Sequence, residues 1–155
     1  MKNEGLAAIA CLKSTRKTLV DLVSPLKEDQ LFLIPEKFKT GILWNLGHLA
    51  VSQQRLHYSL ASLPTYTDRR FTVTFAKGSD PAKWKKVPDK EEVLSLLLDL
   101  PEKLDADYRG GKFEQFTPYD TSAGHRLETI EDSLIFNNFH EGLHMGIIQT
   151  LMKFV

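Results

Sequence analysis

Two histidines spaced four residues apart, His140 and His144, constrain this chain more than any other feature of its sequence. Residues i and i+4 of a helix lie on one face, so a helix here would present both imidazoles to the same side. Apolar side chains around them recur at helical spacing and form one stripe that includes both histidines. These side chains are Phe136, Leu143, Ile147, Leu151 and Phe154. Buried imidazole nitrogens need partners, so the pair predicts either a metal site or core histidines bonded to other polar side chains.

Length and composition narrow the class of protein. The 155 residues are expected to form a single domain, 1–155, with 42% hydrophobic and 26% charged residues, as is ordinary for a globular chain. Lysine plus arginine equal aspartate plus glutamate at 20 each, which gives no charge-based case for nucleic acid or an anionic membrane. With no membrane-length apolar run and no secretory signal, we expect a cytoplasmic protein. The single cysteine, Cys11, allows no intrachain disulfide and is expected to be packed.

Apolar periodicity and helix-boundary residues predict four amphipathic helices. Pro25 ends the first, Thr40 is the expected N-cap of the second, Asp89 begins the third and Thr129 caps the fourth. Their expected ranges are 3–24, 40–62, 89–109 and 129–155. Four such helices predict an all-α four-helix bundle.

The connector of residues 64–88 is the longest segment without a predicted helix. Its aromatic residues favour an ordered cover over a free loop, and residues 72–75 alternate as a short strand would. The second helix is apolar on two sides, and His48 lies on the smaller strip with Trp44 and Val51. A helix of this kind is usually sandwiched between two partners. One could be a second subunit, so we expect a homodimer.

The histidine pair needs at least one more ligand to hold a metal ion. His48 is the best candidate, because it lies near the middle of a helix that can pack beside the fourth. His57 is expected at the surface, and His125 lies in the loop before the last helix, with a smaller chance of lining the site. Three imidazoles and an open position are typical of a catalytic metal site, and zinc, nickel, iron and copper all accept such donors.

The string from His140 to His144 also matches the His-Glu-x-x-His pattern of zinc proteases, in which Glu141 would be the general base. Only eleven residues follow His144 (155 − 144), and no sheet is predicted to edge a substrate cleft, so a protease is disfavoured. Glu141 could be catalytic, face solvent or orient a neighbouring helix. Asn45 and Asn137 could each bond to a metal ligand or bridge two helices.

Two motifs carry a family resemblance: Trp44-Asn45-Leu46-Gly47-His48, and His140-Glu141-x-x-His144-x-Gly146 preceded by Thr129 and Leu134. Two loop features accompany them. These are Lys77-Gly78-Ser79 followed by Pro88, and Thr117-Pro118 through Gly124. With these features the sequence resembles the DinB-like (damage-inducible) superfamily of metal-binding four-helix bundles over nearly its whole length.

The resemblance implies an up-down-down-up bundle with a long crossover connection. It implies His48, His140 and His144 as three metal ligands at one end of the bundle interior, with zinc or nickel as the usual metal and a homodimer as a common assembly. Similar proteins include transferases and isomerases that use the thiols bacillithiol or mycothiol, and they are not DNA-binding proteins. Many members have glutamine directly after the last glycine, where this chain has Ile147.

These observations lead to two functional expectations. The first is a metal-dependent enzyme that activates a low-molecular-weight thiol or water, with S-transfer ahead of hydrolysis. The second is a non-catalytic bundle that binds a small molecule or partner, in which the metal is structural or absent. The sequence names neither the substrate nor the metal.

Overall fold

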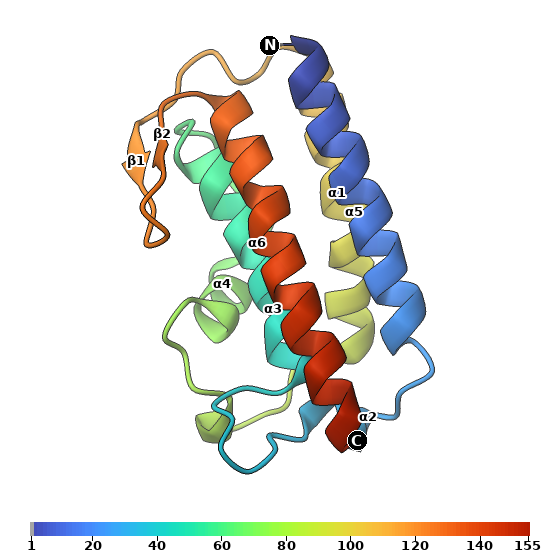
Figure 1. The fold of residues 1–155 in the computed structure, drawn as a ribbon. Helices are drawn as coiled ribbons and strands as arrows, with labels where there is room; N and C mark the ends of the chain where they lie inside the picture. The colour runs from blue at the N-terminus through green and yellow to red at the C-terminus, as the bar shows by residue number, and fades with distance from the viewer. Residues whose placement is uncertain (1) are drawn as a thin grey trace.

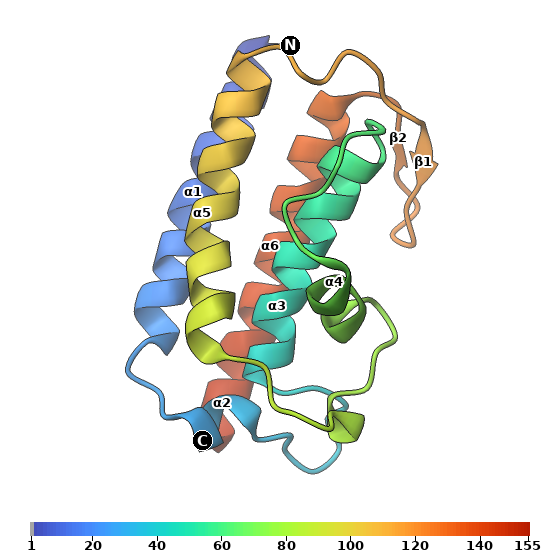
Figure 2. The same cartoon turned by 180° about the vertical axis from the view of Figure 1, so that it is seen from behind.

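Four long helices pack around an apolar core in the computed structural model, which describes residues 2–155 (Figure 1). They are α1 (Lys2–Val23), α3 (Ile42–Gln53), α5 (Lys90–Arg109) and α6 (Ile130–Leu151). Both α1 and α3 pack against α5 and α6, and so they occupy opposite corners of the bundle. Helices α1 and α6 run in one direction, and α3 and α5 run in the other (Figures 1 and 2). The predicted all-α, up-down-down-up bundle is therefore confirmed.

Local capping determines where two of these helices begin. The Asp89 side chain accepts a hydrogen bond from the backbone of Glu91 at the start of α5. Thr129 and Asp132 form a reciprocal capping box at the start of α6. Helix α5 continues through Pro101 to Arg109. Both predicted starts are correct, because these caps depend on residues within one turn.

The start of α3 differs from the prediction. Gly41, in extended conformation, is the N-cap, and Thr40 lies one residue further out. The Thr40 hydroxyl accepts a hydrogen bond from Asn45 Nδ2 at 3.2 Å, so it does not cap the helix. The amide of Asn45 thus connects two residues at the entrance of α3, with a consequence for the site described below.

Beyond Gln53 the helix widens into a π-helical turn, η1 (Gln54–Ser59). A π turn has one more residue per turn than an α turn and changes the direction of the side chains that follow it. His57 is consequently fully buried, and the expectation of a surface position is wrong. The wide turn is coupled to α6, because the Ser133 hydroxyl donates to the Leu56 carbonyl at 2.8 Å.

The long crossover contains a short helix, α4 (Arg69–Phe75), and a single turn, η2 (Pro81–Lys83). The short strand that the alternation at 72–75 suggested is therefore wrong, because these residues belong to α4. Asp68 caps α4 by accepting from the Phe71 backbone, and Phe71 and Phe75, one turn apart, are buried against α3. The expected ordered cover is present, because α4 packs on α3 (Figure 2).

Three smaller elements complete the chain. Helix α2 (Glu28–Phe32) lies below the bundle beside α3, and η3 (Met152–Phe154) ends the chain. Strands β1 (Tyr119–Asp120) and β2 (Arg126–Leu127) form an antiparallel hairpin that the sequence did not predict. Gly124, with a φ of 82°, supplies the left-handed residue in its turn.

The burial of α3 explains its two-sided apolar pattern. Eleven of its twelve residues are buried, with α5 and α6 on one side and α4 and α2 on the other. The second strip therefore meets elements of the same chain, and it no longer argues for a subunit contact. Cys11, expected to be packed, is exposed. Among residues 2–155, no helix combines the length and the apolar character needed to cross a membrane.

Candidate metal centre

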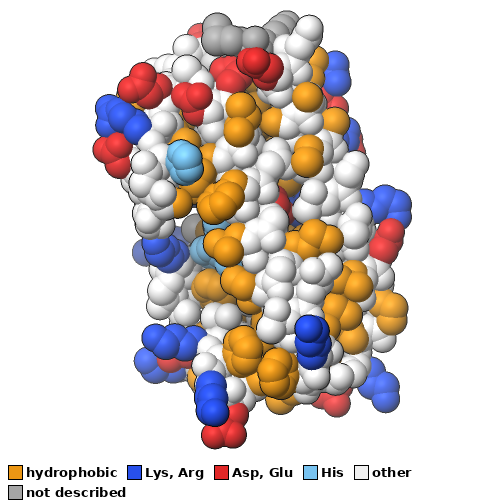
Figure 3. Space-filling view, viewed as in Figure 1, with side chains coloured by type: hydrophobic (Ala, Val, Ile, Leu, Met, Phe, Trp, Pro, Cys, Tyr) orange, Lys and Arg blue, Asp and Glu red, His pale blue; other side chains and the backbone are white. Residues whose placement is uncertain are grey.

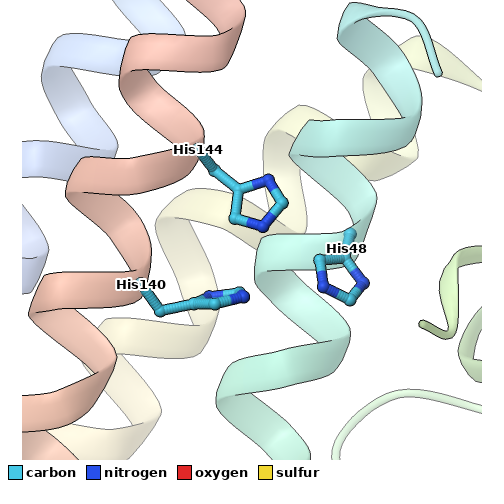
Figure 4. Close-up of side chains that lie close together, drawn as sticks. All are labelled: His48, His140 and His144. Atoms are coloured by element: carbon cyan, nitrogen blue, oxygen red, sulfur yellow. The ribbon is translucent and has the colours of Figure 1, made fainter. Parts of the chain in front are cut away.

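Three of the five histidines meet where the middle of α3 faces α6 (Figure 4). One candidate ligand nitrogen from each of His48, His140 and His144 lies within 4.8 Å of the other two. The ring centroids are 4.5 to 5.4 Å apart. The structure thus brings together the three predicted ligands and leaves out His125, which is exposed on the hairpin, and His57.

His48 is held on two sides by protein groups. Its Nδ1 lies 2.9 Å from the carbonyl oxygen of Phe75, which can only accept, so Nδ1 carries the proton and donates. The indole of Trp44 stacks on the imidazole with centroids 4.7 Å apart and planes within 9° of parallel. The Ser52 hydroxyl donates to Nε2 at 3.2 Å. The lone pair of His48 therefore lies on Nε2, the atom available to an ion.

His144 is oriented from the neighbouring helix. Its Nδ1 lies 2.8 Å from Asn45 Oδ1. The amide nitrogen of Asn45 donates to the Gly41 carbonyl at 2.8 Å, so the oxygen must be the atom that faces His144. His144 therefore carries its proton on Nδ1 and presents Nε2, an arrangement that metal-binding histidines commonly show. One hydrogen bond fulfils both alternatives for Asn45, because it reaches a candidate ligand, His144, and joins α3 to α6.

The motif of residues 44–48 can now be explained residue by residue. Trp44 stacks on His48, and Asn45 fixes His144. A Cβ atom at Gly47 would lie 2.3 Å from Cδ1 of Phe75, so only glycine lets α4 approach α3 this closely. That approach brings the Phe75 carbonyl to His48. A glycine inside a helical pattern is a signal of close packing, and it could have indicated this contact from the sequence.

His140 differs from the other two rings. Its Nδ1 is buried and has no hydrogen-bond partner within the described part of the chain. Burial, followed by the neighbouring His144 and His48, lowers the pKa of His140 to about 3. Burial and then His48 lower the pKa of His144 to about 4, and burial lowers the pKa of His48. All three imidazoles are therefore neutral at pH 7, the state in which they donate to metals.

The cluster fits a divalent transition metal. Two nitrogens bound to one tetrahedral ion, each at about 2.1 Å, lie about 3.4 Å apart, so nitrogens within 4.8 Å of one another need to close by up to about 1.4 Å per pair. Side-chain rotation of the least constrained ring, His140, changes its distances to His48 and His144. A buried nitrogen without a partner is unfavourable, and an ion among the three rings is the partner this cluster lacks. Imidazole donors alone do not identify the metal.

Glu141 lies between the two α6 ligands in sequence but belongs to a different contact. It is fully buried, and its two oxygens accept hydrogen bonds from Nε and Nη2 of Arg16 at 2.6 and 2.7 Å. Nη2 of Arg16 also donates to the Leu49 carbonyl, so this ion pair ties α1 to α6 and α3. Glu141 does not face solvent, and its contacts favour the third alternative, that it orients a neighbouring helix. Both oxygens have a charged partner, which gives no support to a general-base role.

Asn137 belongs to the same buried group as Glu141. Its Nδ2 donates to Glu141 Oε1 at 3.4 Å, and no hydrogen bond to the three histidines is present. This hydrogen bond lies within α6, so neither alternative for Asn137, contact with a candidate ligand or a bridge between two helices, is observed. The polar pair is separated from the histidines because residues 137 and 141 face α1, whereas 140 and 144 face α3.

A cavity of about 390 Å³ opens beside the histidine cluster, with His48 and His140 in its wall. The rest of the wall comes from the end of α3, η1, the loop of residues 65–67, α4 and the residues that follow it, the β1–β2 hairpin and Phe136 of α6. Figure 3 shows a hollow at this place, with pale-blue histidine surface at its edge and a basic side chain across from it. The cluster can therefore be reached from outside by a small molecule.

This combination defines a class of protein: an all-α bundle of up-down-down-up topology with three histidines, gathered from α3 and α6, that could hold a metal ion beside an accessible cavity. In a comparison with protein families, the DinB superfamily matches residues 12–148. The chain belongs to the DinB superfamily, a metal-associated group, as the resemblance implied. A comparison with curated proteins gave no match.

Proposed function

We propose that this protein is a metal-dependent enzyme in which His48, His140 and His144 hold zinc or nickel and activate a thiol or water. Transfer of a thiol is the first reaction class and hydrolysis the second. The observation that carries the proposal is a cluster of three neutral imidazoles that opens into a cavity of about 390 Å³. A catalytic site needs such an open side, whereas structural zinc usually has four protein ligands.

An ion held by three imidazoles keeps a free coordination position and lowers the pKa of a thiol or water bound there. The chain's own residues prepare that position. The Phe75 carbonyl and the Asn45 amide hold two rings in the tautomer that presents Nε2. Trp44 covers one face of His48 and keeps water from it. The Ser52 hydroxyl, which bonds to His48 Nε2, is freed for a ligand in the cavity when that nitrogen coordinates.

The ranking of the two reactions follows from the absence of a free base. Within the described chain, no carboxylate lines the cavity, and Glu141 is engaged by Arg16. A thiol, with an ordinary pKa of about 8.5, ionises far more readily than water at about 15.7 and therefore depends less on a base. These contacts support thiol transfer over hydrolysis.

The first test is elemental analysis of tag-free wild type beside His48→Ala, His144→Ala and the control His125→Ala. We expect about one metal per chain in wild type and in His125→Ala, because His125 lies outside the cluster. We expect little metal in the other two variants. Absence of metal from wild type after incubation with zinc and nickel salts would contradict the proposal.

The second test separates an enzyme from a non-catalytic bundle. Metal-loaded protein is screened with several low-molecular-weight thiols and electrophilic acceptors. If no thiol supports turnover on fully loaded protein, transfer is wrong. A melt with chelator then decides the role of the metal, because a structural ion contributes more to the melting temperature than an ion bound to a preformed bundle.

A further inference from the structure

We propose that the cavity beside the histidine cluster binds a small molecule with a negatively charged group, and that Lys77 and Arg55 hold that group. This inference rests on the proposed function, since it names the class of substrate or thiol that the same site would take. It is carried by the charges of the cavity wall and by its hydroxyl groups.

The two basic side chains in the wall have no acidic partners. Nζ of Lys77 donates to the Ser122 hydroxyl at 3.3 Å, and residues 2–155 include no carboxylate within ion-pair distance of it. The Arg55 guanidinium donates to the Tyr119 hydroxyl at 3.4 Å and lies 5.2 Å from the centre of that ring, again with no ion pair in this range. Arg126, on the neighbouring hairpin, does pair with Asp120. Lys77 and Arg55 are therefore free to take an external anion.

The histidine cluster adds to this positive charge. Three histidine ligands would leave the full charge of a divalent ion uncompensated, whereas a carboxylate ligand would remove one unit. Lys77, His48 and His140 line the same cavity. A ligand that spans the cavity thus meets positive charge at both ends, and a negative group is the one that such a site attracts.

The remainder of the wall indicates what lies between the two ends. Hydroxyl groups surround the cavity and offer donors to a polar ligand, while Val51, Leu56 and Phe136 supply apolar contact. They include the hydroxyls of Ser52, Ser59, Thr67, Thr72, Thr121 and Ser122. The volume is at the lower end of the range for small-molecule sites. The ligand is therefore a short molecule with a metal-directed group at one end and a carboxylate or phosphate at the other.

The test uses zinc-loaded protein and three thiols of similar size whose tails differ in charge: 3-mercaptopropionate, 2-mercaptoethanol and cysteamine. Titration calorimetry measures each affinity. We expect the negative thiol to bind most tightly and the positive one most weakly, with about tenfold between them. Lys77→Gln and Arg55→Gln should each reduce that ratio several-fold. Lys83→Gln is the matched control, because Lys83 lies in the same connector, pairs with Asp80 and does not line this cavity.

The outcomes separate the two proposals. If loaded protein binds cysteamine as tightly as 3-mercaptopropionate, or if Lys77→Gln and Lys83→Gln behave alike, the anion inference is overturned and the metal proposal stands. If the protein takes up neither zinc nor nickel, the proposed function fails. The anion inference is then tested on metal-free protein by NMR titration with succinate and with phosphate. Loss of binding in Lys77→Gln supports the inference, and unchanged binding overturns it. On zinc-loaded protein, the affinities for 2-mercaptoethyl phosphate and 3-mercaptopropionate are compared. The tighter of the two shows whether the site prefers phosphate or carboxylate.

Discussion

Asn45 Oδ1 accepts a hydrogen bond from Nδ1 of His144 at 2.8 Å, so a residue of α3 determines which nitrogen a histidine of α6 presents to the histidine cluster. The same amide donates to Gly41 at the first turn of α3. The orientation of His144 thus depends on the packing of two helices that are far apart in sequence. This relationship makes the affinity for metal sensitive to a residue that would not itself be a ligand.

Asn45→Ala tests that dependence. Without the acceptor, His144 can turn and change tautomer, and loss of such a contact typically lowers metal affinity 10–100-fold, by order of magnitude. Competition between the protein and a chromophoric chelator measures the affinity. Asn45→Asp keeps an acceptor and should recover most of the binding. Equal affinity in wild type and Asn45→Ala would mean that the hydrogen bond has no role in the site.

Gly47→Ala tests the close approach of α4 to α3. A methyl group 2.3 Å from Phe75 must displace that ring, and overpacking of this kind costs about 1–3 kcal/mol. Metal affinity should fall too, because Phe75 holds His48. Gly142→Ala is the matched control on α6, where nothing lies within 4 Å of the added methyl. It should raise the free energy of unfolding by about 0.5–1 kcal/mol and leave metal affinity unchanged. Urea denaturation and the chelator assay measure the two quantities.

The ion pair between Arg16 and Glu141 is expected to be structural. Glu141→Ala leaves a buried guanidinium without its partner and should lower the free energy of unfolding by about 3–5 kcal/mol. The double variant Arg16→Met with Glu141→Leu removes both charges and should regain most of that loss. Metal content and any thiol-dependent turnover are measured on the double variant. Intact folding with turnover abolished would restore Glu141 as a catalytic candidate.

Acid should destabilise the metal-free protein through His57. Burial lowers the pKa of His57 to about 3, so below about pH 6.5 the unfolded chain binds a proton that the native chain does not. The free energy of unfolding is therefore highest above about pH 6.5. Below that pH it falls by about 1.4 kcal/mol per pH unit for one histidine. His57→Leu should reduce the slope between about pH 6 and about pH 4.5 by that amount, measured by urea denaturation with chelator present. Gln53→Leu, a buried neighbour without a titrating group, should leave the slope unchanged.

The expected homodimer remains a prediction, and the structure directs it to a different surface. Ile135, Phe139 and Leu143 follow each other at one-turn intervals on α6 and are 53–56% exposed. Figure 3 shows apolar side chains on the face to which α6 belongs. Phe139→Arg with Leu143→Arg should convert a dimer to a monomer in light scattering, whereas Leu98→Arg, an exposed apolar position on α5, should not. A wild-type monomer at micromolar concentration would remove the prediction.

The parts of the fold that the sequence predicts correctly are those decided within a few residues. The caps at Asp89 and Thr129 and the shared face of His140 and His144 depend on one helical turn. The errors lie where distant packing overrides the local pattern. Residues 72–75 alternate like a strand but form part of α4, because Phe71 and Phe75 bury themselves on α3. His57 is buried because the π turn redirects it, and no periodicity of 3.6 residues anticipates that turn.

In the candidate site, too, the local features could be predicted from the sequence and the contacts between distant residues could not. The three histidines could be proposed from helical spacing and from the family resemblance. The partner of His48, the Phe75 carbonyl, is a backbone atom 27 residues away, and a backbone acceptor has no signature in the sequence. The Arg16–Glu141 pair joins positions 125 residues apart. No local pattern in the sequence indicates that both oxygens of Glu141 accept from Arg16.

Phe75 and Lys77 are two residues apart at the end of α4, and each contacts a different half of the site. One holds the ring of His48, and the other reaches the Ser122 hydroxyl across the mouth of the cavity. A molecule that draws Lys77 inward therefore pulls on the short tether that positions His48. Such a tether couples the binding of the molecule to the binding of the proposed metal. A ligand that raises the affinity for the metal is then itself bound more tightly by the metal-loaded protein, by the same factor.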